Sequence, residues 1–298
     1  MAETELYDYF RTTEGVFIQR ATFSSVGTKL GLPILLRNDC GNRVVDGLRF
    51  RKFKTNGEQL PQLTEALYRE DLGGDVYQVE TSQVLNQWHH SKLQLTDERK
   101  TIAEKVFDIT GFKVSMIGSF LLGYEKIGSD MDFVVYGSNA HQSVIENWDK
   151  ILKAVRGTNP PVKAFEKKAR LYSLRFGIDP EILRKIIERR NAKFYVNGTE
   201  ASLIYSYGPS DEIPIHPYQP IEQSVEVTLE DVVIDNAHAL MMPRMYQCEG
   251  STVWSFRWMD RGFAYAGDKV TIKGNRIDDR DIILSGDNHY ILPSGLRK

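Results

Sequence analysis

Short runs of apolar residues separated by polar turns fill the first third of the chain, a pattern typical of strands. Val16–Ile18 and Pro33–Leu36 are apolar, and Asn38–Asn42 between them and the next run carries turn residues. Residues 48–53 alternate apolar and basic side chains, so their basic face would meet a polyanion or protect a sheet edge. Residues 1–94 are therefore predicted to form a small strand-rich accessory domain.

Longer periodicities follow, and residues 95–208 are predicted to mix helices with strands. Acids in the first turn and apolar Ile102 and Val106 on one face predict a helix with Thr96 as its N-cap. Pro180 opens another amphipathic stretch. The predicted elements are helices over 96–107, 143–155 and 180–190, strands over 113–117 and 131–136, and a β-hairpin over 193–205 that turns at Asn197–Gly198.

The last part of the chain is predicted to be all-β. Four prolines fall within residues 208–220, so residues 209–220 are interpreted as a linker or an extended arm. Alternating apolar and polar residues then predict several short strands, which suggests a small OB-like barrel over 221–298. The predicted strands are 225–229, 252–258, 269–275, 282–284 and 289–292.

Two carboxylates, Asp130 and Asp132, open the apolar strand at 131–136. Side chains alternate along a strand, so both acids are expected on one face, roughly 6–7 Å apart. The two negative charges repel each other, which raises the pKa values of both carboxyl groups unless a divalent cation lies between them. Oxygen ligands on rigid backbone suit Mg²⁺ or Mn²⁺, which also accept water and phosphate oxygens.

Gly118 and Ser119 end the preceding strand and are predicted to open a short helix. Glycine lets the backbone approach a ligand closely, and the N–H groups at a helix start favour an anion such as a triphosphate. A phosphate-binding turn beside a carboxylate pair is the minimum arrangement for metal-assisted phosphoryl or nucleotidyl transfer.

The combination of Gly118-Ser119, ten residues and Asp130-x-Asp132 in an apolar strand resembles the signature of the DNA polymerase β-like nucleotidyltransferase superfamily. The longer string Ser129–Gly137 is similar to a group of predicted, archaeal-type nucleotidyltransferases. Residues 14–17, 46–53 and 189–200 resemble that group more loosely. The resemblance implies a polymerase β-like α+β core with Asp130 and Asp132 as catalytic metal ligands, and Gly118 and Ser119 against the β and γ phosphates.

The resemblance also implies a third catalytic, metal-binding carboxylate on a neighbouring strand. Glu200 is the nearest candidate, and it shares a face with Ser202 in the predicted hairpin. If Ser202 takes the place of the usual acid, the site is incomplete; if Glu200 serves, the site is complete with a longer side chain. Three acids beyond the expected boundary are alternatives: Glu226, Glu230 and Asp235.

Several basic and polar residues are candidates for ligand contacts, each with a plainer interpretation. Arg189 and Arg190 would clamp a triphosphate or complement a helix dipole, and Lys126 would contact phosphate or lie solvated in a loop. The candidate nucleotide-binding residues are Gly118, Ser119, Lys126, Ser129, Arg189 and Arg190. On the barrel, an outward basic set would bind single-stranded nucleic acid or form a solvated face; its members are Arg257, Arg261, Lys269 and Lys273.

Composition adds few constraints. The chain has 298 residues, 26% charged, with a net charge of −2, so nucleic-acid binding would need a local basic patch. The two cysteines lie far apart, which suggests a reducing compartment, and the six histidines form no motif. We expect a cytoplasmic protein with neither a signal peptide nor a membrane span.

Together these observations predict a Mg²⁺-dependent (or Mn²⁺-dependent) nucleotidyltransferase. It would move a nucleotide from ATP or another NTP to an acceptor hydroxyl, RNA being the first expectation and a tRNA 3′ end one form of it. A toxin-type or antiphage tRNA transferase is included, as is modification of a protein or small molecule. The alternative is a module that lacks the third acid and binds nucleotide or nucleic acid without transfer.

Overall fold

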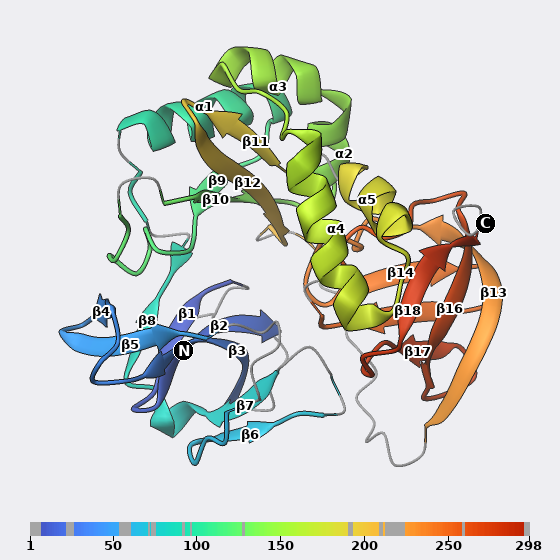
Figure 1. The fold of residues 1–298 in the computed structure, drawn as a ribbon, viewed down its shortest axis with the longest axis horizontal. Coiled ribbons are helices and arrows are strands. Elements are labelled where there is room, and N and C mark those ends of the chain that lie inside the picture. The colour runs from blue at the N-terminus through green and yellow to red at the C-terminus, as the bar shows by residue number, and fades with distance from the viewer. Residues whose placement is uncertain are drawn as a thin grey trace.

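The computed structural model describes residues 7–21, 27–53, 61–70, 72, 76–90, 93–95, 97–126, 129–189, 193–208, 211, 224–257 and 260–294. Its architecture is mixed α+β, with three separate sheets (Figure 1). None of the described helices is long and apolar enough to cross a bilayer.

An eight-stranded sheet forms the N-terminal part, with β4-β5-β3-β2-β1-β8 as its main path and β7 pairing β3 and β6. The predicted alternation is present in β5, where Phe50 is buried while Arg49, Arg51 and Lys52 are exposed. The elements are β1 (Tyr9–Arg11), β2 (Gly15–Ala21), β3 (Thr28–Arg37), β4 (Arg43–Val45), β5 (Leu48–Lys52), β6 (Ala66–Tyr68), β7 (Tyr77–Glu80), the 3₁₀ helix η1 (Thr81–Gln83) and β8 (Asn86–Trp88).

The central sheet has four strands in the order β11-β12-β10-β9, and β10 runs parallel to β12. Phe133 and Val135 are fully buried, and they belong to the same hydrophobic cluster as residues of the covering helices. Helices α1–α3 lie over one side of this sheet, and the N-terminal sheet lies on the other (Figure 1). The strands are β9 (Val114–Met116), β10 (Met131–Tyr136), β11 (Lys193–Val196) and β12 (Thr199–Ser206).

The helices differ from the prediction at two places. The helix expected over 143–155 is two helices broken at Asn147, and the longest helix, α4, was not predicted. A hydrophobic cluster joins Tyr172 of α4 and Leu183 of α5 to the barrel, so these helices pack with the C-terminal part although they lie within residues 95–208. The helices are α1 (Asp97–Thr110), α2 (Ala140–Glu146), α3 (Trp148–Val155), α4 (Val162–Phe176) and α5 (Pro180–Glu188).

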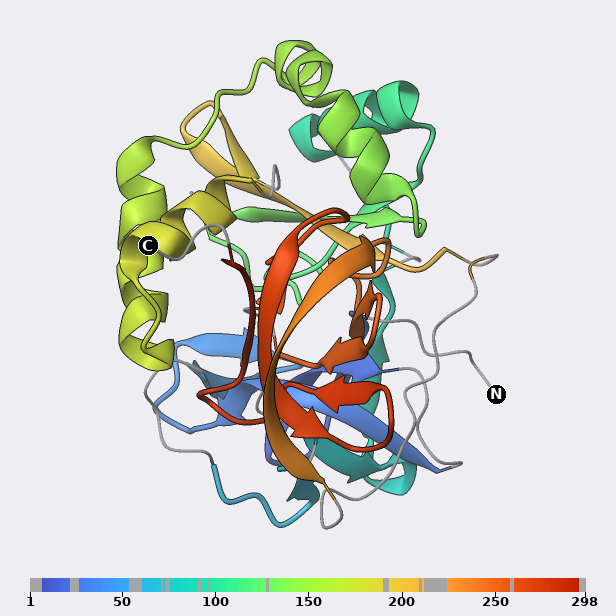
Figure 2. The ribbon, with the colours of Figure 1, turned by 90° about the vertical axis from the view of Figure 1, so that its right-hand side faces the viewer.

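The C-terminal part confirms the prediction of a small barrel. Strands β13-β14-β15-β17-β16 follow one another, and β16 pairs back with β13, which closes five strands, while β18 extends from β16 (Figure 2). The strands are β13 (Val225–Asp235), β14 (Arg244–Cys248), β15 (Thr252–Ser255), β16 (Lys269–Arg276), β17 (Asp281–Ile283) and β18 (Tyr290–Pro293).

Most of the predicted linker, residues 209–220, lies outside the described residues. Asp211 is described, and its carboxylate accepts hydrogen bonds from the backbone N–H groups of Ser138 at 2.8 Å and Gly208 at 2.7 Å. Both cysteines are free thiols: Cys40 is exposed and Cys248 is buried.

Candidate functional site

Asp132 lies near the start of β10, on the face of the central sheet that turns toward the N-terminal sheet. Alternation along the strand puts Asp132 on the same face as Tyr136, whose hydroxyl forms a hydrogen bond with Nδ1 of His90. Asp130 directly precedes the strand and is exposed. Burial, and next the charge of Asp130, raises the pKa of Asp132 to about 6. The pair therefore concentrates negative charge at one end of the strand.

The neighbouring strand places a serine, not an acid, beside Asp132. In the parallel pairing of β10 with β12, Ser202 is in register with Asp132. The Ser202 side chain forms a hydrogen bond with the Asp132 carboxylate, which partly offsets the rise in its pKa. Of the two alternatives left open by the sequence, this register favours the one in which Ser202 occupies the place of the usual third acid.

Glu200 lies on the same face of β12 but is engaged by β11. Lys193 Nζ forms an ion pair with Glu200, and the Tyr195 hydroxyl donates a hydrogen bond to its Oε2 at 3.0 Å. Burial opposes ionisation of Glu200, but the hydrogen bond and charge of Lys193 outweigh it, and its pKa is lowered. Among the residues that the structure describes, no three His, Cys, Asp or Glu side chains group closely enough to bind a metal ion. Glu200 is thus engaged by Lys193 and Tyr195, and the metal site of Asp130, Asp132 and Glu200 stays a prediction.

The segment after β9 is a single helical turn rather than the predicted helix. The N–H of Leu122 donates to the carbonyl of Gly118 at 3.3 Å, and the N–H of Tyr124 donates to the carbonyl of Ser119 at 3.0 Å, which ends the turn. The Gly118 N–H donates to the Tyr9 hydroxyl at 3.0 Å. This amide, which we expected to face a phosphate, is thus engaged by the N-terminal sheet.

Glycine at position 118 is required for two reasons. Its φ is +78°, and a Cβ atom there would lie 3.2 Å from Oδ2 of Asp132. Gly118→Ala is expected to lower the free energy of unfolding by about 1–2 kcal/mol and to weaken Mn²⁺ binding, because the methyl group presses on the carboxylate. Urea unfolding and Mn²⁺ titration measure the two effects.

Gly123 supplies the matched control for this variant. It belongs to the same turn, its φ is +67°, and nothing lies within 4 Å of a Cβ there. Gly123→Ala should carry a similar conformational cost and leave Mn²⁺ affinity unchanged. Equal loss of Mn²⁺ affinity in both variants would contradict a specific role for the Gly118–Asp132 contact.

A tyrosine and an arginine that the sequence analysis did not select also lie at the site. The charges of Asp130 and Asp132 contribute to a raised pKa of Tyr124, after burial and against the charge of Arg43. Arg43, from β4, lies over the Tyr124 ring at 5.7 Å from its centroid. No sequence signal links residues this far apart, since the contact depends on how the N-terminal sheet packs against the central one.

Lys126 and Ser129 lie in the loop before Asp130. The Lys126 N–H donates to Oγ of Ser129 at 2.9 Å, and the Ser129 N–H donates to the Lys126 carbonyl at 2.9 Å. Both residues line a pocket of 460 Å³ at this end of the central sheet. Its other lining residues are Asp97, Glu98, Arg99, Glu125, Met131 and Thr199.

Arg189 does not reach the carboxylate pair. Its guanidinium forms an ion pair with Asp268 at 3.0 Å and lies over the Tyr265 ring at 4.7 Å from the centroid. These contacts attach the end of α5 to the barrel, so they do not support the predicted nucleotide contact of Arg189, which stays a prediction. Arg190 lies outside the described residues.

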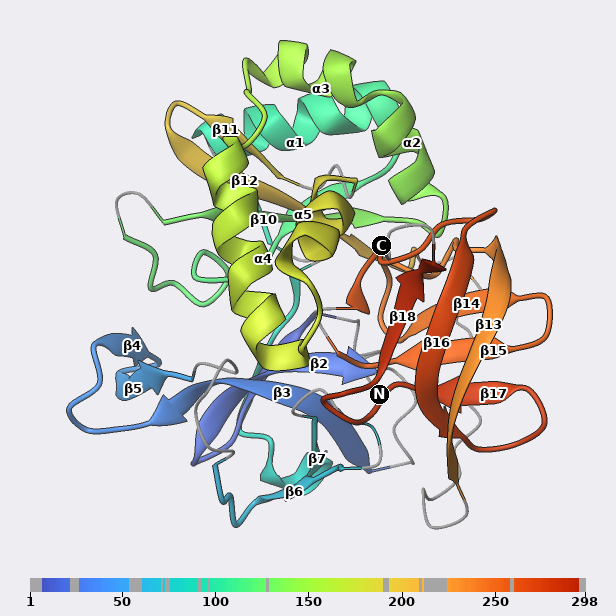
Figure 3. The same ribbon diagram turned by 45° about the vertical axis from the view of Figure 1, so that its right-hand side comes forward.

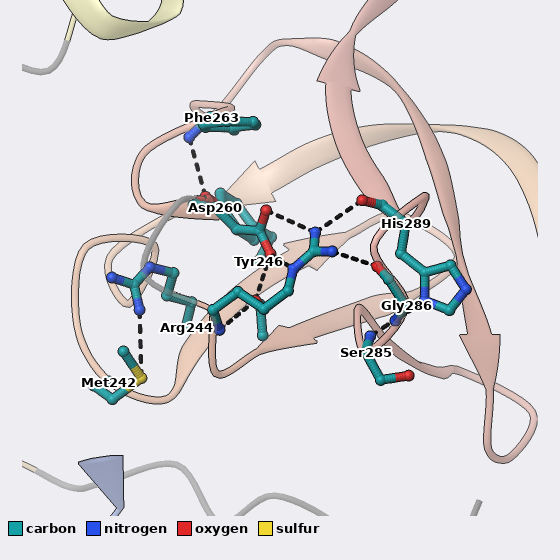
Figure 4. Close-up of polar contacts among 10 residues, drawn as sticks. Met242, Arg244, Tyr246, Asp260, Phe263, Ser285, Gly286 and His289 are labelled. Carbon is teal, nitrogen blue, oxygen red and sulfur yellow. Dashed lines mark hydrogen bonds and ion pairs between the residues drawn. The ribbon is translucent and has the colours of Figure 1, made fainter. Parts of the chain in front are cut away.

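The predicted basic set of the barrel does not form an outward face. Arg257 is buried and pairs with Asp260 at 2.6 Å, and it also donates to the carbonyls of Gly286 and His289 (Figure 4). Arg261 is buried as well, and its guanidinium donates to the carbonyl of Leu203 in the central sheet. The prediction that these two arginines point outward is wrong, because the carboxylate and the carbonyls inside compensate their buried charge.

The two lysines of that set differ from the arginines. Lys273 forms an ion pair with Glu226 at 3.5 Å, whereas Lys269 is exposed. The alternative acids Glu226, Glu230 and Asp235 all lie in β13 and make contacts within the barrel. Glu226 lies 3.3 Å from Nε2 of His289, Glu230 accepts from Ser294, and Asp235 accepts from the Ala237 N–H.

Comparisons of this chain with protein-family models, with curated protein sequences and with solved structures find no match.

Proposed function

We propose that the protein is a metal-dependent nucleotidyltransferase with a polymerase β-like core and an OB-like C-terminal barrel, and that it acts in the cytoplasm. The observation that carries the proposal is the placement of Asp132 beside Asp130 at the start of β10, with its pKa raised to about 6. Keeping a half-buried carboxylate next to a second acid is unfavourable unless a cation compensates both. Gly118 lies against Asp132, which supports a role for this turn at the site.

The donor set fits one divalent cation shared with substrate phosphates. Asp130 and Asp132 would hold Mg²⁺ or Mn²⁺, which would neutralise charge on the triphosphate when bound. Lys193 adds positive charge on the other side of Ser202, where its charge lowers the pKa of Asp132. Ser119, Lys126 and Ser129 are the residues available to contact the nucleotide from the loops around the pair.

In the proposed reaction an acceptor hydroxyl attacks the α-phosphorus of an NTP. One P–O bond forms, the bond from the α-phosphorus to the bridging oxygen breaks, pyrophosphate leaves and the hydroxyl proton passes to water. Asp130 and Asp132 organise the charged groups, and Lys193 stabilises added negative charge. RNA is the proposed acceptor, with a protein or a small molecule as the other acceptor classes.

A second candidate function is binding of nucleotide or nucleic acid without transfer. It is favoured by Ser202 beside Asp132 and by the engagement of Glu200 with Lys193 and Tyr195. In this case the carboxylate pair would bind a metal–nucleotide complex, and no pyrophosphate would form.

Label transfer separates the two functions. The protein is incubated with Mg²⁺ or Mn²⁺ and each α-labelled NTP in turn, with total RNA, total protein or a small-molecule extract as acceptor. We expect label on RNA from the wild type and a loss of at least about 10³-fold in Asp130→Ala/Asp132→Ala, because both metal ligands are removed. Equilibrium binding of each NTP with Mn²⁺ is measured on the same samples. NTP binding without label on any acceptor would establish the second function, and neither binding nor transfer would overturn both.

A further inference from the structure

Helix α4 is the most basic element of the chain. Its sequence VKAFEKKARLYSLRF carries five basic side chains and one acid, in a protein whose net charge is −2. Lys163, Lys167 and Arg170 follow one another at spacings of four and three residues, which places them on one face over about 10 Å. All three are exposed, and no described acid forms an ion pair with them.

Two leucines interrupt the solvent-facing side of the same helix. Leu174 is 88% exposed and Leu171 is 45% exposed. The opposite side of α4 is covered, since Ala169 and Tyr172 are buried in the cluster shared with α5 and the barrel. The exposed side is therefore a surface of cations and apolar groups on a helix anchored from behind.

Helix α4 also lies near β12, and the residue that shows this, Lys168, is between the exposed face and the covered side of the helix. Lys168 of α4 lies over the Tyr172 ring at 5.6 Å, and its charge contributes to the lowered pKa of Glu200, after burial and the contacts of Lys193 and Tyr195. The helix runs from the β11–β12 hairpin toward the N-terminal sheet (Figures 1 and 3). A polymer lying along α4 would thus pass close to the strand that pairs with β10.

We propose that the exposed face of α4 binds the sugar–phosphate backbone of the acceptor nucleic acid and leads its end to the carboxylate pair. This inference rests on the proposed function, because it assigns the acceptor of that reaction. Lys163, Lys167 and Arg170 contact successive phosphates, and Leu171 and Leu174 lie against sugars or bases between them.

The arrangement of the basic side chains on α4 favours a nucleic acid over an acidic protein as the ligand. The cations form a line rather than a cluster, and a repeating anion satisfies a line with equal contacts. Strand β5 presents Arg49, Arg51 and Lys52 at the surface of the N-terminal sheet, toward which α4 points. A polymer long enough to span both elements would meet positive charge at each end, which favours an extended strand.

The test is direct binding of fluorescent unstructured 20-nucleotide RNA and DNA, without NTP or metal, at several salt concentrations. The variant Lys163→Gln/Lys167→Gln removes two charges from α4. Its matched control, Lys150→Gln/Lys153→Gln, removes two exposed charges from α3. Each single-strand phosphate contact contributes about 0.7 to the slope of log affinity against log salt, so the α4 variant should lose about 1.4 and bind about 25-fold more weakly at 0.1 M salt. The α3 control should bind like the wild type.

Each outcome bears on the inference by itself. Equal binding by both variants, or no oligonucleotide binding by the wild type, would overturn the inference. Polyglutamate is the acidic-polypeptide probe, and a larger loss of polyglutamate binding than of oligonucleotide binding in Lys163→Gln/Lys167→Gln would also overturn it. Preference between the RNA and DNA arms identifies the acceptor polymer. Mn²⁺–NTP binding, which should be unchanged in the α4 variant and lost in Asp130→Ala/Asp132→Ala, separates failure at α4 from failure of the proposed function.

Discussion

Replacing Asp132 by asparagine is expected to stabilise the fold at pH 8 by about 2 kcal/mol and to abolish Mn²⁺–NTP binding. The stabilisation follows from the pKa of Asp132, which burial and the charge of Asp130 raise from 3.8 to about 6. Each pKa unit corresponds to about 1.4 kcal/mol, and the partial exposure of the Asp132 side chain reduces the full gain. A site residue whose removal stabilises the protein is typical of functional positions.

The stabilisation by Asp132→Asn should depend on pH. A group whose pKa is higher in the folded than in the unfolded protein binds protons more tightly when folded, so its penalty is present above pH 6 and disappears as the pH falls toward 3.8. The advantage of Asp132→Asn in urea unfolding should therefore shrink from pH 8 to pH 4. Asp149→Asn, which removes an exposed carboxylate from α3, is measured beside it as the control. A destabilised Asp132→Asn at pH 8 would contradict the account of the carboxylate pair.

The same proton competes with the metal ion. Since a carboxylate must be ionised to bind a cation, wild-type Mn²⁺ affinity should fall as the pH drops below about 6.

Local patterns predicted the element that carries the pair. Strand β10 occupies residues 131–136 as predicted, because a run of apolar residues bounded by polar ones needs no tertiary information to be recognised. The strand-rich N-terminal part and the barrel followed from the same kind of periodicity. Helix α4 was missed because exposed Leu171 and Leu174 obscure its apolar stripe.

Contacts between residues far apart in the chain could not be predicted from the sequence. Arg257 alternates with aromatic residues as an outward side chain would, yet it is buried and paired with Asp260. Arg261 is also buried, and it donates to the Leu203 carbonyl of the central sheet. The contacts of Tyr9 with Gly118 and of Arg43 with Tyr124 depend on two sheets meeting face to face. Such pairs have no spacing rule that a single sequence could reveal.

The register between β10 and β12 is the feature on which the function depends most. More than sixty residues separate Asp132 from Ser202, and a shift of two positions along β12 would have placed Glu200 beside Asp132 instead. The parallel pairing places Ser202 beside Asp132, at the position where the resemblance implies a third carboxylate.

Filling that position by Ser202→Asp is expected to create the three-carboxylate site. Without metal, like charges directly opposite one another on adjacent strands should lower the free energy of unfolding by about 1–3 kcal/mol. The new ligand should tighten Mn²⁺ binding by at least about tenfold. Mn²⁺ at 100 times its dissociation constant should then restore about 2.7 kcal/mol, because it binds only the folded state.

Ser202→Asn tests whether charge rather than size is responsible, since it enlarges the side chain without adding a carboxylate. It should not tighten Mn²⁺ binding, and Mn²⁺ should stabilise it no more than it stabilises the wild type. Label transfer by Ser202→Asp then separates the two proposed functions. If only this variant transfers label, the natural chain binds nucleotide without transferring it. If the wild type transfers label and Ser202→Asp transfers less, then Asp130, Asp132 and Lys193 are sufficient for transfer. If, at the same Mn²⁺ concentration, Mn²⁺ stabilises Ser202→Asp no more than Ser202→Asn, position 202 does not lie at the metal site and the proposed place of the third carboxylate is wrong.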